Sequence, residues 1–140
     1  MEEYKVVITD VDGVEFDGIL ITGEDSGSDN LSLMLRSERC SVSRDAEDYF
    51  SALCQIREEL EKDGMIIVCN GGSKDVYPSP MMRDMGDGDQ AYRLIIGQPA
   101  SLSNTVNIFD SDVEKFISCT VKEQEEFYQF WLKSKKVNPS

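Results

Sequence analysis

The sequence contains no histidine. Histidine is the side chain whose ordinary pKa lies nearest to neutral pH, and it supplies the general base of Ser-His-Asp and Cys-His catalysis. Imidazole is also a frequent zinc ligand. The absence of histidine therefore excludes these catalytic constellations and every zinc site that needs imidazole.

Cysteine is sparse, and its four positions form no C-x-x-C pair: Cys40, Cys54, Cys69 and Cys119. A zinc site would need all four widely separated thiols to converge. Apolar neighbours such as Leu53 and Val68 favour buried, reduced thiols instead. We predict no metal and no cofactor.

Long apolar runs are absent as well. No stretch approaches the ~20 consecutive apolar residues of a transmembrane helix. The chain starts with Met1, Glu2 and Glu3, and lacks the basic start and apolar core of a secretory signal. We therefore expect a cytoplasmic protein, and the length of 140 residues predicts a single domain over residues 1–140.

Basic residues are few. The sequence has 14 Lys and Arg against 27 Asp and Glu, which gives a net charge of −13. Such a charge argues against nucleic acid and anionic membrane as partners. The acidity is concentrated in residues 1–30, where Lys5 is the single basic residue. This region is either a solvated face that keeps the protein soluble or a surface that attracts a basic partner.

Alternating apolar residues predict an N-terminal meander of three strands, at residues 4–9, 14–22 and 31–36. Asp12-Gly13 is a strong hairpin signal between the first two strands, and the polar residues 23–30 form the second turn. Further strands are expected at residues 65–68, 91–96 and 105–109.

Two helices follow from three- and four-residue spacing of apolar side chains. The first covers residues 46–60, with Ser43 as its N-cap and Asp63-Gly64 at its end. The second opens with the capping box Thr120 to Glu123 and carries an aromatic stripe. The predicted order βββ-α-βββ-α indicates an α+β fold, a mostly antiparallel sheet packed against two main helices.

Residues 69–92 are the least regular part of the sequence, with two prolines, four glycines and no sustained periodicity. Loops longer than about 12–15 residues are usually functional or disordered. The apolar side chains here argue against disorder, and we expect Tyr77, Met81 and Met85 to anchor the loop to the core.

The charged residues of this loop allow two interpretations. Arg83 and Asp84 could pair with each other or with Asp75 and Lys74, which would make a self-packed loop stapled by ion pairs. Alternatively, the loop could be a preorganised surface whose charged side chains meet a partner.

The segment Ile8-Thr9-Asp10-Val11-Asp12-Gly13-Val14 resembles the first motif of the haloacid dehalogenase phosphotransferases. In that superfamily a strand delivers an aspartate nucleophile and, two residues later, an aspartate general acid beside magnesium. Asp10 and Asp12 would take these roles. That fold requires a parallel sheet, whereas three strands joined by short turns predict antiparallel pairing. The D-x-D-G pattern also fits an acidic hairpin turn.

A second resemblance covers residues 69–132, roughly half of the chain. It is carried by Cys69-Asn70-Gly71-Gly72, Lys74-Asp75-Val76-Tyr77-Pro78-Ser79-Pro80-Met81, Arg83-Asp84-Met85-Gly86-x-Gly88, Ala91-Tyr92-x-Leu94, Asn107-Ile108-Phe109 and Thr120-Val121-x-Glu123-Gln124-x-x-Phe127-Tyr128-x-x-Trp131-Leu132. These motifs resemble a family of small, mostly uncharacterised bacterial proteins. Some of its members are similar to immunity proteins encoded beside secreted toxins, including contact-dependent growth inhibition systems. The resemblance implies no catalytic residues.

Together these observations predict a non-enzymatic immunity protein that neutralises a basic toxin domain, such as a nuclease, in the cytoplasm. The candidate partner-binding residues come from the acidic meander and the long loop: Asp10, Asp12, Glu15, Asp17, Lys74, Asp75, Tyr77, Arg83, Asp84 and Asp87. The alternatives are a magnesium-dependent phosphatase that uses Asp10 and Asp12, and a structural protein with no toxin partner.

Overall fold

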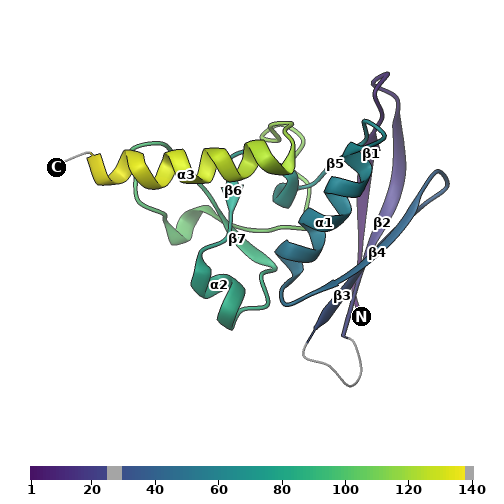
Figure 1. Ribbon diagram of the computed structural model, residues 1–140, viewed down its shortest axis with the longest axis horizontal. Coiled ribbons are helices and arrows are strands. Elements are labelled where there is room, and N and C mark those ends of the chain that lie inside the picture. The colour runs from purple at the N-terminus through teal and green to yellow at the C-terminus, as the bar shows by residue number, and fades with distance from the viewer. Residues whose placement is uncertain (25–29, 138–140) are drawn as a thin grey trace.

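The computed structural model describes residues 1–24 and 30–137 (Figure 1). Within these residues the chain forms a five-stranded sheet, a three-stranded sheet and three α-helices. This arrangement confirms the predicted α+β class. The polar turn predicted at residues 23–30 lies largely outside the described residues.

The larger sheet has the strand order β4-β3-β2-β1-β5, with antiparallel pairing throughout. Its strands are β1 (Glu3–Thr9), β2 (Glu15–Glu24), β3 (Leu31–Ser37), β4 (Ser41–Ala46) and β5 (Ile66–Val68). The first three strands are the predicted meander. A tight turn joins β1 to β2, and Gly13 occupies the left-handed region there with φ of +80°, as the Asp-Gly hairpin signal predicts.

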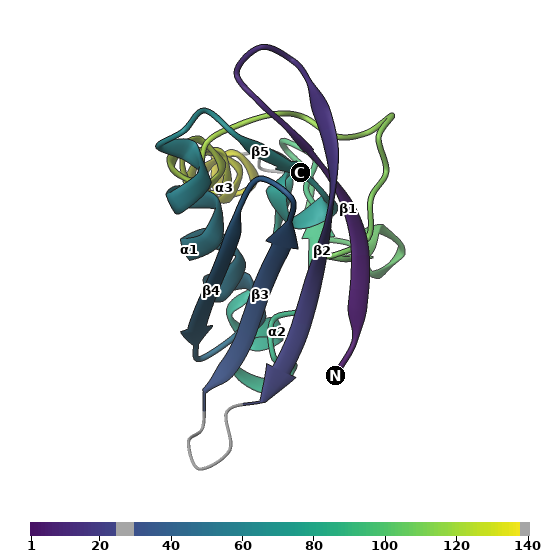
Figure 2. The ribbon, with the colours of Figure 1, turned by 90° about the vertical axis from the view of Figure 1, so that its right-hand side faces the viewer.

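One face of this sheet builds the core. Residues such as Ile8, Leu20 and Leu33 point inward and are fully buried, because side chains alternate between the two faces of a strand. Helix α1 (Tyr49–Glu61) packs against this face (Figure 1). The opposite face has no covering helix from the described chain (Figure 2).

Strand β4 corrects the prediction that Ser43 caps the first helix. Ser43 lies within β4 and pairs with Met34 of β3. The helix begins later, where Asp48 is the N-cap and accepts a hydrogen bond from the Ser51 backbone N–H (2.8 Å). The ladder between β3 and β4 spans six residue pairs, and its backbone hydrogen bonds outweigh the local preference of one serine for a cap.

The C-terminal half is built from short elements. They are the 3-10 turn η1 (Asn70–Gly72), β6 (Val76–Tyr77), α2 (Pro80–Met85), β7 (Gln90–Arg93), the 3-10 turn η2 (Leu102–Asn104), β8 (Thr105–Asn107) and α3 (Val121–Val137). Strands β6, β7 and β8 pair antiparallel as the small sheet. The predicted order βββ-α-βββ-α is therefore wrong, because four strands precede α1 and the long loop contains η1, β6 and α2.

Helix α3 starts as predicted. The Glu123 carboxylate accepts from the Thr120 N–H (2.8 Å), and the Thr120 hydroxyl accepts from the Glu123 N–H (3.1 Å), which is a reciprocal capping box. Hydrogen bonding from Thr120 lowers the pKa of Glu123. The helix then runs away from the sheet, with its C-terminal end at the far side of the molecule (Figure 1).

A buried polar network joins α1, η1 and α3. Arg57 is 4% exposed and Gln124 is 1% exposed. The Arg57 guanidinium donates to Gln124 Oε1 (2.6 Å) and to the carbonyls of Gly71, Gly72 and Cys119 (3.3–3.4 Å). In turn, the Gln124 amide donates to three further carbonyl contacts at 2.8–3.0 Å. The donors of both side chains thus end on neutral acceptors.

Glycine at position 71 makes this junction possible. A Cβ atom at Gly71 would lie 2.6 Å from a Leu53 methyl group and 2.8 Å from the Ile108 Cβ. Both distances are shorter than real contacts allow, so a side chain at position 71 would push η1 away from α1. The Gly71 carbonyl would then lose both Arg57 and Gln124.

Replacing Gln124 tests this network. In Gln124→Leu, the buried guanidinium loses its shortest acceptor and three carbonyls lose a donor, so we expect the free energy of unfolding to fall by ~3–5 kcal/mol. The matched control is Gln129→Leu on the exposed side of the same helix, with an expected change within ~0.5 kcal/mol. Chemical denaturation measures both, and equal stabilities of the two variants would contradict the assignment.

Candidate functional site

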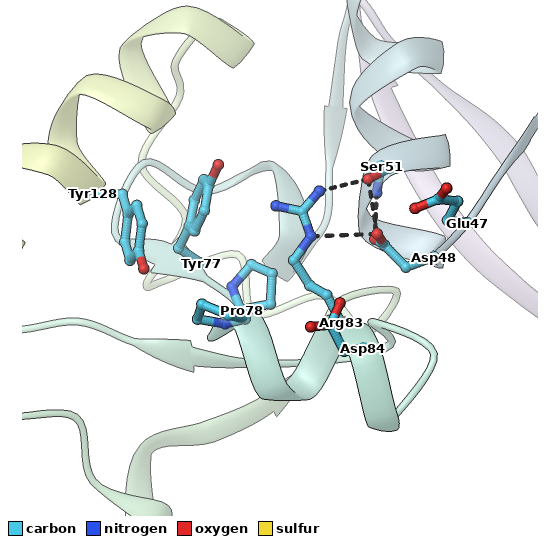
Figure 3. Close-up of a pocket in the computed structure, with 9 residues that line it drawn as sticks. Glu47, Asp48, Ser51, Tyr77, Pro78, Arg83, Asp84 and Tyr128 are labelled. Carbon is cyan, nitrogen blue, oxygen red and sulfur yellow. Dashed lines mark hydrogen bonds and ion pairs between the residues drawn. The ribbon is translucent and has the colours of Figure 1, made fainter.

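The start of α1, strand β6, helix α2 and helix α3 surround a cleft of about 360 Å³ (Figure 3). Its lining residues come from all four elements: Glu47, Asp48, Ser51, Tyr77, Pro78, Pro80, Arg83, Asp84 and Tyr128. Three of them, Tyr77, Arg83 and Asp84, are among the residues predicted from the long loop. The others approach from segments distant in the sequence.

Arg83 points from α2 across the cleft to the first turn of α1 (Figure 3). Its Nε donates to Asp48 Oδ2 at 3.3 Å, and its Nη2 donates to the Ser51 hydroxyl. Burial disfavours the guanidinium charge, but the attraction and hydrogen bond of Asp48 outweigh it, so the pKa of Arg83 is raised. The predicted pairing of Arg83 with Asp84 or Asp75 is therefore corrected: its partner is Asp48, a residue that also caps α1.

Tyr77 anchors the loop, as predicted. Its ring stacks on Tyr128 of α3 (centroids 4.1 Å apart) and meets Phe50 of α1 edge to face (4.9 Å). Burial raises the pKa of Tyr77, and the neighbouring Arg83 opposes this shift. Tyr77 thus fixes the wall of the cleft where β6, α1 and α3 meet.

Met81 and Met85 do not anchor the loop, which corrects the prediction. Their side chains are 69% and 81% exposed, and α2 buries none of its residues. The helix is instead held by polar contacts, including the Ser79 N-cap, whose hydroxyl accepts from the Met82 N–H (3.2 Å). An apolar side chain favours burial, but whether it is buried depends on which other segments pack against it.

Asp84 and Asp87 lie on the outside of this region together with Glu47, and all three are exposed. The Asp87 carbonyl accepts from the Tyr49 N–H (2.7 Å), so the turn after α2 is tied to the start of α1. Asp87 has φ of +62°, a left-handed conformation that aspartate tolerates better than most residues. Next to it, burial and then the charges of Asp87 and Glu2 raise the pKa of Asp89.

The four hairpin candidates lie elsewhere. The turn between β1 and β2 is at the opposite end of the molecule from α2 (Figures 1 and 2). The Asp10 carboxylate accepts from the N–H groups of Asp12 and Val14 (both 2.9 Å) and pairs with Arg39 (2.8 Å). Arg39 in particular lowers the pKa of Asp10. Asp10 therefore shapes the hairpin turn.

The remaining hairpin acids face solvent. Asp12, Glu15 and Asp17 are exposed and make no ion pair with a described residue. Glu15 and Asp17 point away from the core while Phe16 packs against it, as strand alternation predicts.

Lys74 and Asp75 lie away from the cleft that the other loop candidates line or border. Asp75 pairs with Arg93 of β7 (3.0 Å) and accepts from the Ser73 hydroxyl (2.8 Å), which makes it part of the small sheet. Lys74 is half-buried, and its backbone N–H donates to the Ile117 carbonyl (2.9 Å). Neither residue lines the cleft.

Sequence reasoning missed Glu47, Asp48, Ser51 and Tyr128. The pattern Asp48-x-x-Ser51 is itself an N-cap signal, but the predicted cap is Ser43, five residues earlier. Tyr128 belongs to the predicted aromatic stripe, and the stacking of its half-buried ring on Tyr77 depends on the position of α3. No pattern in the sequence pairs Asp48 with Arg83, 35 residues away.

The described residues offer neither a metal cluster nor a membrane-spanning helix. Among residues 1–24 and 30–137, no three potential metal-ligating side chains of His, Cys, Asp or Glu gather at one point. Each helix of this part of the chain is too short or too polar to cross a membrane. The cysteines are free thiols, and burial raises the pKa of Cys54 and of Cys69 to about 11.

Replacing Asp48 with asparagine tests how α2 is held. Asparagine keeps the cap of α1 but removes the charge that holds Arg83. We expect amide hydrogen exchange at Arg83 and Gly86 to quicken about three- to tenfold, a modest effect because the ion pair is partly exposed. Exchange within α1 should not change. Asp45→Asn, on exposed β4, is the control, and unchanged exchange in α2 of Asp48→Asn would contradict this role.

No protein-family model matches the chain, and no curated protein matches it significantly. The resemblance to immunity proteins therefore remains a prediction.

Proposed function

We propose that this protein is a non-enzymatic binding protein, an immunity protein that neutralises a basic bacterial toxin domain, such as a nuclease, in the cytoplasm. The proposal rests on one observation above all, the placement of charge. The net charge is −13, and several of the basic side chains contact other groups of the same chain.

Six basic side chains are engaged within the described fold. Five form ion pairs with carboxylates, and Arg57 is buried in the polar network: Arg39, Arg44, Arg57, Lys62, Arg83 and Arg93. Each ion pair also neutralises one carboxylate and so leaves the net charge unchanged, whereas the buried Arg57 meets only neutral acceptors; a partner therefore meets a surface that keeps the strong net negative charge of the composition. Nucleases that bind phosphate backbones are basic, so an acidic inhibitor would be steered to them electrostatically and could cover their active sites.

The phosphatase alternative finds less support. Strand β1 pairs antiparallel with both of its neighbours, β2 and β5, whereas the haloacid dehalogenase mechanism uses a parallel sheet. The Asp10 carboxylate is occupied by two backbone N–H groups and by Arg39. A magnesium-dependent phosphomonoesterase activity that disappears in Asp10→Asn would favour the phosphatase over our proposal.

The direct test starts from the gene beside that of this protein, which we expect to encode the basic toxin domain. We expect the purified protein to bind that domain, to block its activity at equimolar concentration, and to protect cells that express it. Calorimetry and growth assays measure these effects. The absence of both binding and protection would contradict the proposal and favour a structural role without a toxin partner.

Charge reversal at the hairpin tests electrostatic steering. We expect Glu15→Lys with Asp17→Lys to slow association at ~0.01 M salt, where the Debye length is about 30 Å, and to leave folding stability nearly unchanged. At physiological salt the Debye length is about 8 Å, so the effect persists only if the hairpin lies close to the bound partner. Stopped-flow kinetics at both salt concentrations measure it, and wild-type association rates at low salt would contradict steering by the hairpin.

A further inference from the structure

Helix α2 presents an apolar face to solvent. Met81 and Met85 are four residues apart and therefore share one side of the helix, and they are 69% and 81% exposed. Most helices in proteins gain their stability by burying an apolar face, yet α2 buries none of its residues. Neighbouring exposed apolar side chains of this kind often mark interaction sites.

The exposure does not come from a loosely attached segment. Pro80 occupies the first turn, where its fixed φ suits a helix. Arg83 ties the helix to Asp48 and Ser51 of α1. At its end, the Met82 carbonyl accepts from the N–H groups of Gly86 and Gly88 (3.1 and 3.0 Å). The two methionines are thus held in place by polar contacts on the other side of the helix, and binding would require little ordering of this backbone.

Two exposed carboxylates accompany this face. Asp84 lies on the same side of α2, and Asp87 lies in the turn that follows the helix. Neither carboxylate forms an ion pair with a described residue. The nearby cation, Arg83, is turned inward to Asp48. An apolar centre with a charged rim is the usual anatomy of a protein interface, and here the rim is negative.

We propose that the α2 face, formed by Met81, Asp84 and Met85 with Asp87 at its rim, is the docking surface for a basic protein. The methionines contact an apolar side chain of that protein, and its flanking Lys or Arg residues meet the two carboxylates. Methionine suits this role because its flexible, polarisable side chain adapts to the partner's shape. This inference rests on the proposed function, since it takes the partner to be the basic toxin domain.

The negative charge of the α2 face favours a basic protein over a second copy of the chain or an anionic membrane. A second copy of the chain docked face to face would place the same carboxylates against one another, and an anionic membrane would be repelled. The uncovered face of the large sheet is a weaker candidate, because its apolar Ile19 and Met34 are interleaved with Lys5, Asp17 and Arg36. Charges of both signs there favour no particular partner.

The test uses a double variant that carries both Met81→Ser and Met85→Ser. Its binding is compared with that of wild type and of a matched control. The control is Met34→Ser on the uncovered sheet, where the methionine is 37% exposed. The probe is the basic toxin domain that the proposed function expects the neighbouring gene to encode. We expect the double variant to bind at least ~10-fold more weakly, mainly through faster dissociation, because central apolar contacts dominate interface energetics. The control should bind within ~2-fold of wild type, and both variants should keep the wild-type Tm.

A second variant tests the rim independently of the methionines. Asp84→Asn with Asp87→Asn keeps side-chain size, and asparagine tolerates the left-handed conformation at position 87. We expect association several-fold slower than wild type at physiological salt, with the difference reduced at high salt. The hairpin variant with Lys at positions 15 and 17 should approach the wild-type rate at physiological salt.

The outcomes separate the two proposals. If wild type binds the toxin domain and the double methionine variant binds equally well, the docking surface is elsewhere and only this inference is overturned. If wild type does not bind, both proposals are overturned. A wild-type dimer in light scattering that the double methionine variant abolishes would assign the face to self-association and would also overturn the inference.

Discussion

The buried guanidinium of Arg57 is the constraint on which the C-terminal half of this protein depends. A buried charge is costly unless its donors are satisfied, and here the acceptors are the Gln124 amide oxygen and backbone carbonyls. These acceptors come from η1, from the residues before α3 and from α3 itself. The hydrogen bonds of the Arg57 guanidinium therefore position three segments at once: η1, the irregular segment before α3, and the start of α3.

The geometry of the cleft depends on the network around Arg57 and Gln124. Gln124 holds the first turn of α3 against the carbonyls of Ser73 and Val76, which places Tyr128, one turn further along the helix, over Tyr77. Tyr77 in turn meets Phe50 on α1. Helix α2 follows Tyr77 directly and is fixed by Arg83 to the start of α1. The network is thus remote from solvent, but it determines where the exposed α2 face points.

Positive and negative side chains have different roles in this molecule. The arginines largely serve the fold, as Arg39 holds the hairpin turn, Arg83 holds α2 and Arg93 holds the small sheet. Many carboxylates remain on the outside. Such a distribution favours recognition of a basic partner, and it places two acidic surfaces, the hairpin and the α2 region, at opposite ends of the molecule (Figures 1 and 2). The methionines at α2 add an apolar centre to its acidic surface.

Much of the fold was determined by local sequence. The three-stranded meander, the Asp-Gly turn and the capping box of α3 all follow from period-two alternation, turn chemistry and reciprocal side-chain hydrogen bonds, which act within a few residues. The exposure of Glu15 and Asp17 followed from the same alternation. Tyr77 was correctly expected to anchor the long loop, because a large aromatic ring has much apolar surface to bury.

Tertiary structure decided the rest, because burial and pairing depend on distant segments. Ser43 has a side chain that suits a helix N-cap, but its segment pairs with β3 and forms strand β4 instead. Met81 and Met85 have apolar side chains, but no other element of the described residues covers them. Arg83 finds Asp48, and Arg57 finds Gln124 across 67 residues of sequence, through contacts that no local pattern encodes. The sequence by itself determined the strands, turns and net charge, and only the packing of α1, α2 and α3 decided which side chains became the core and which became the surface.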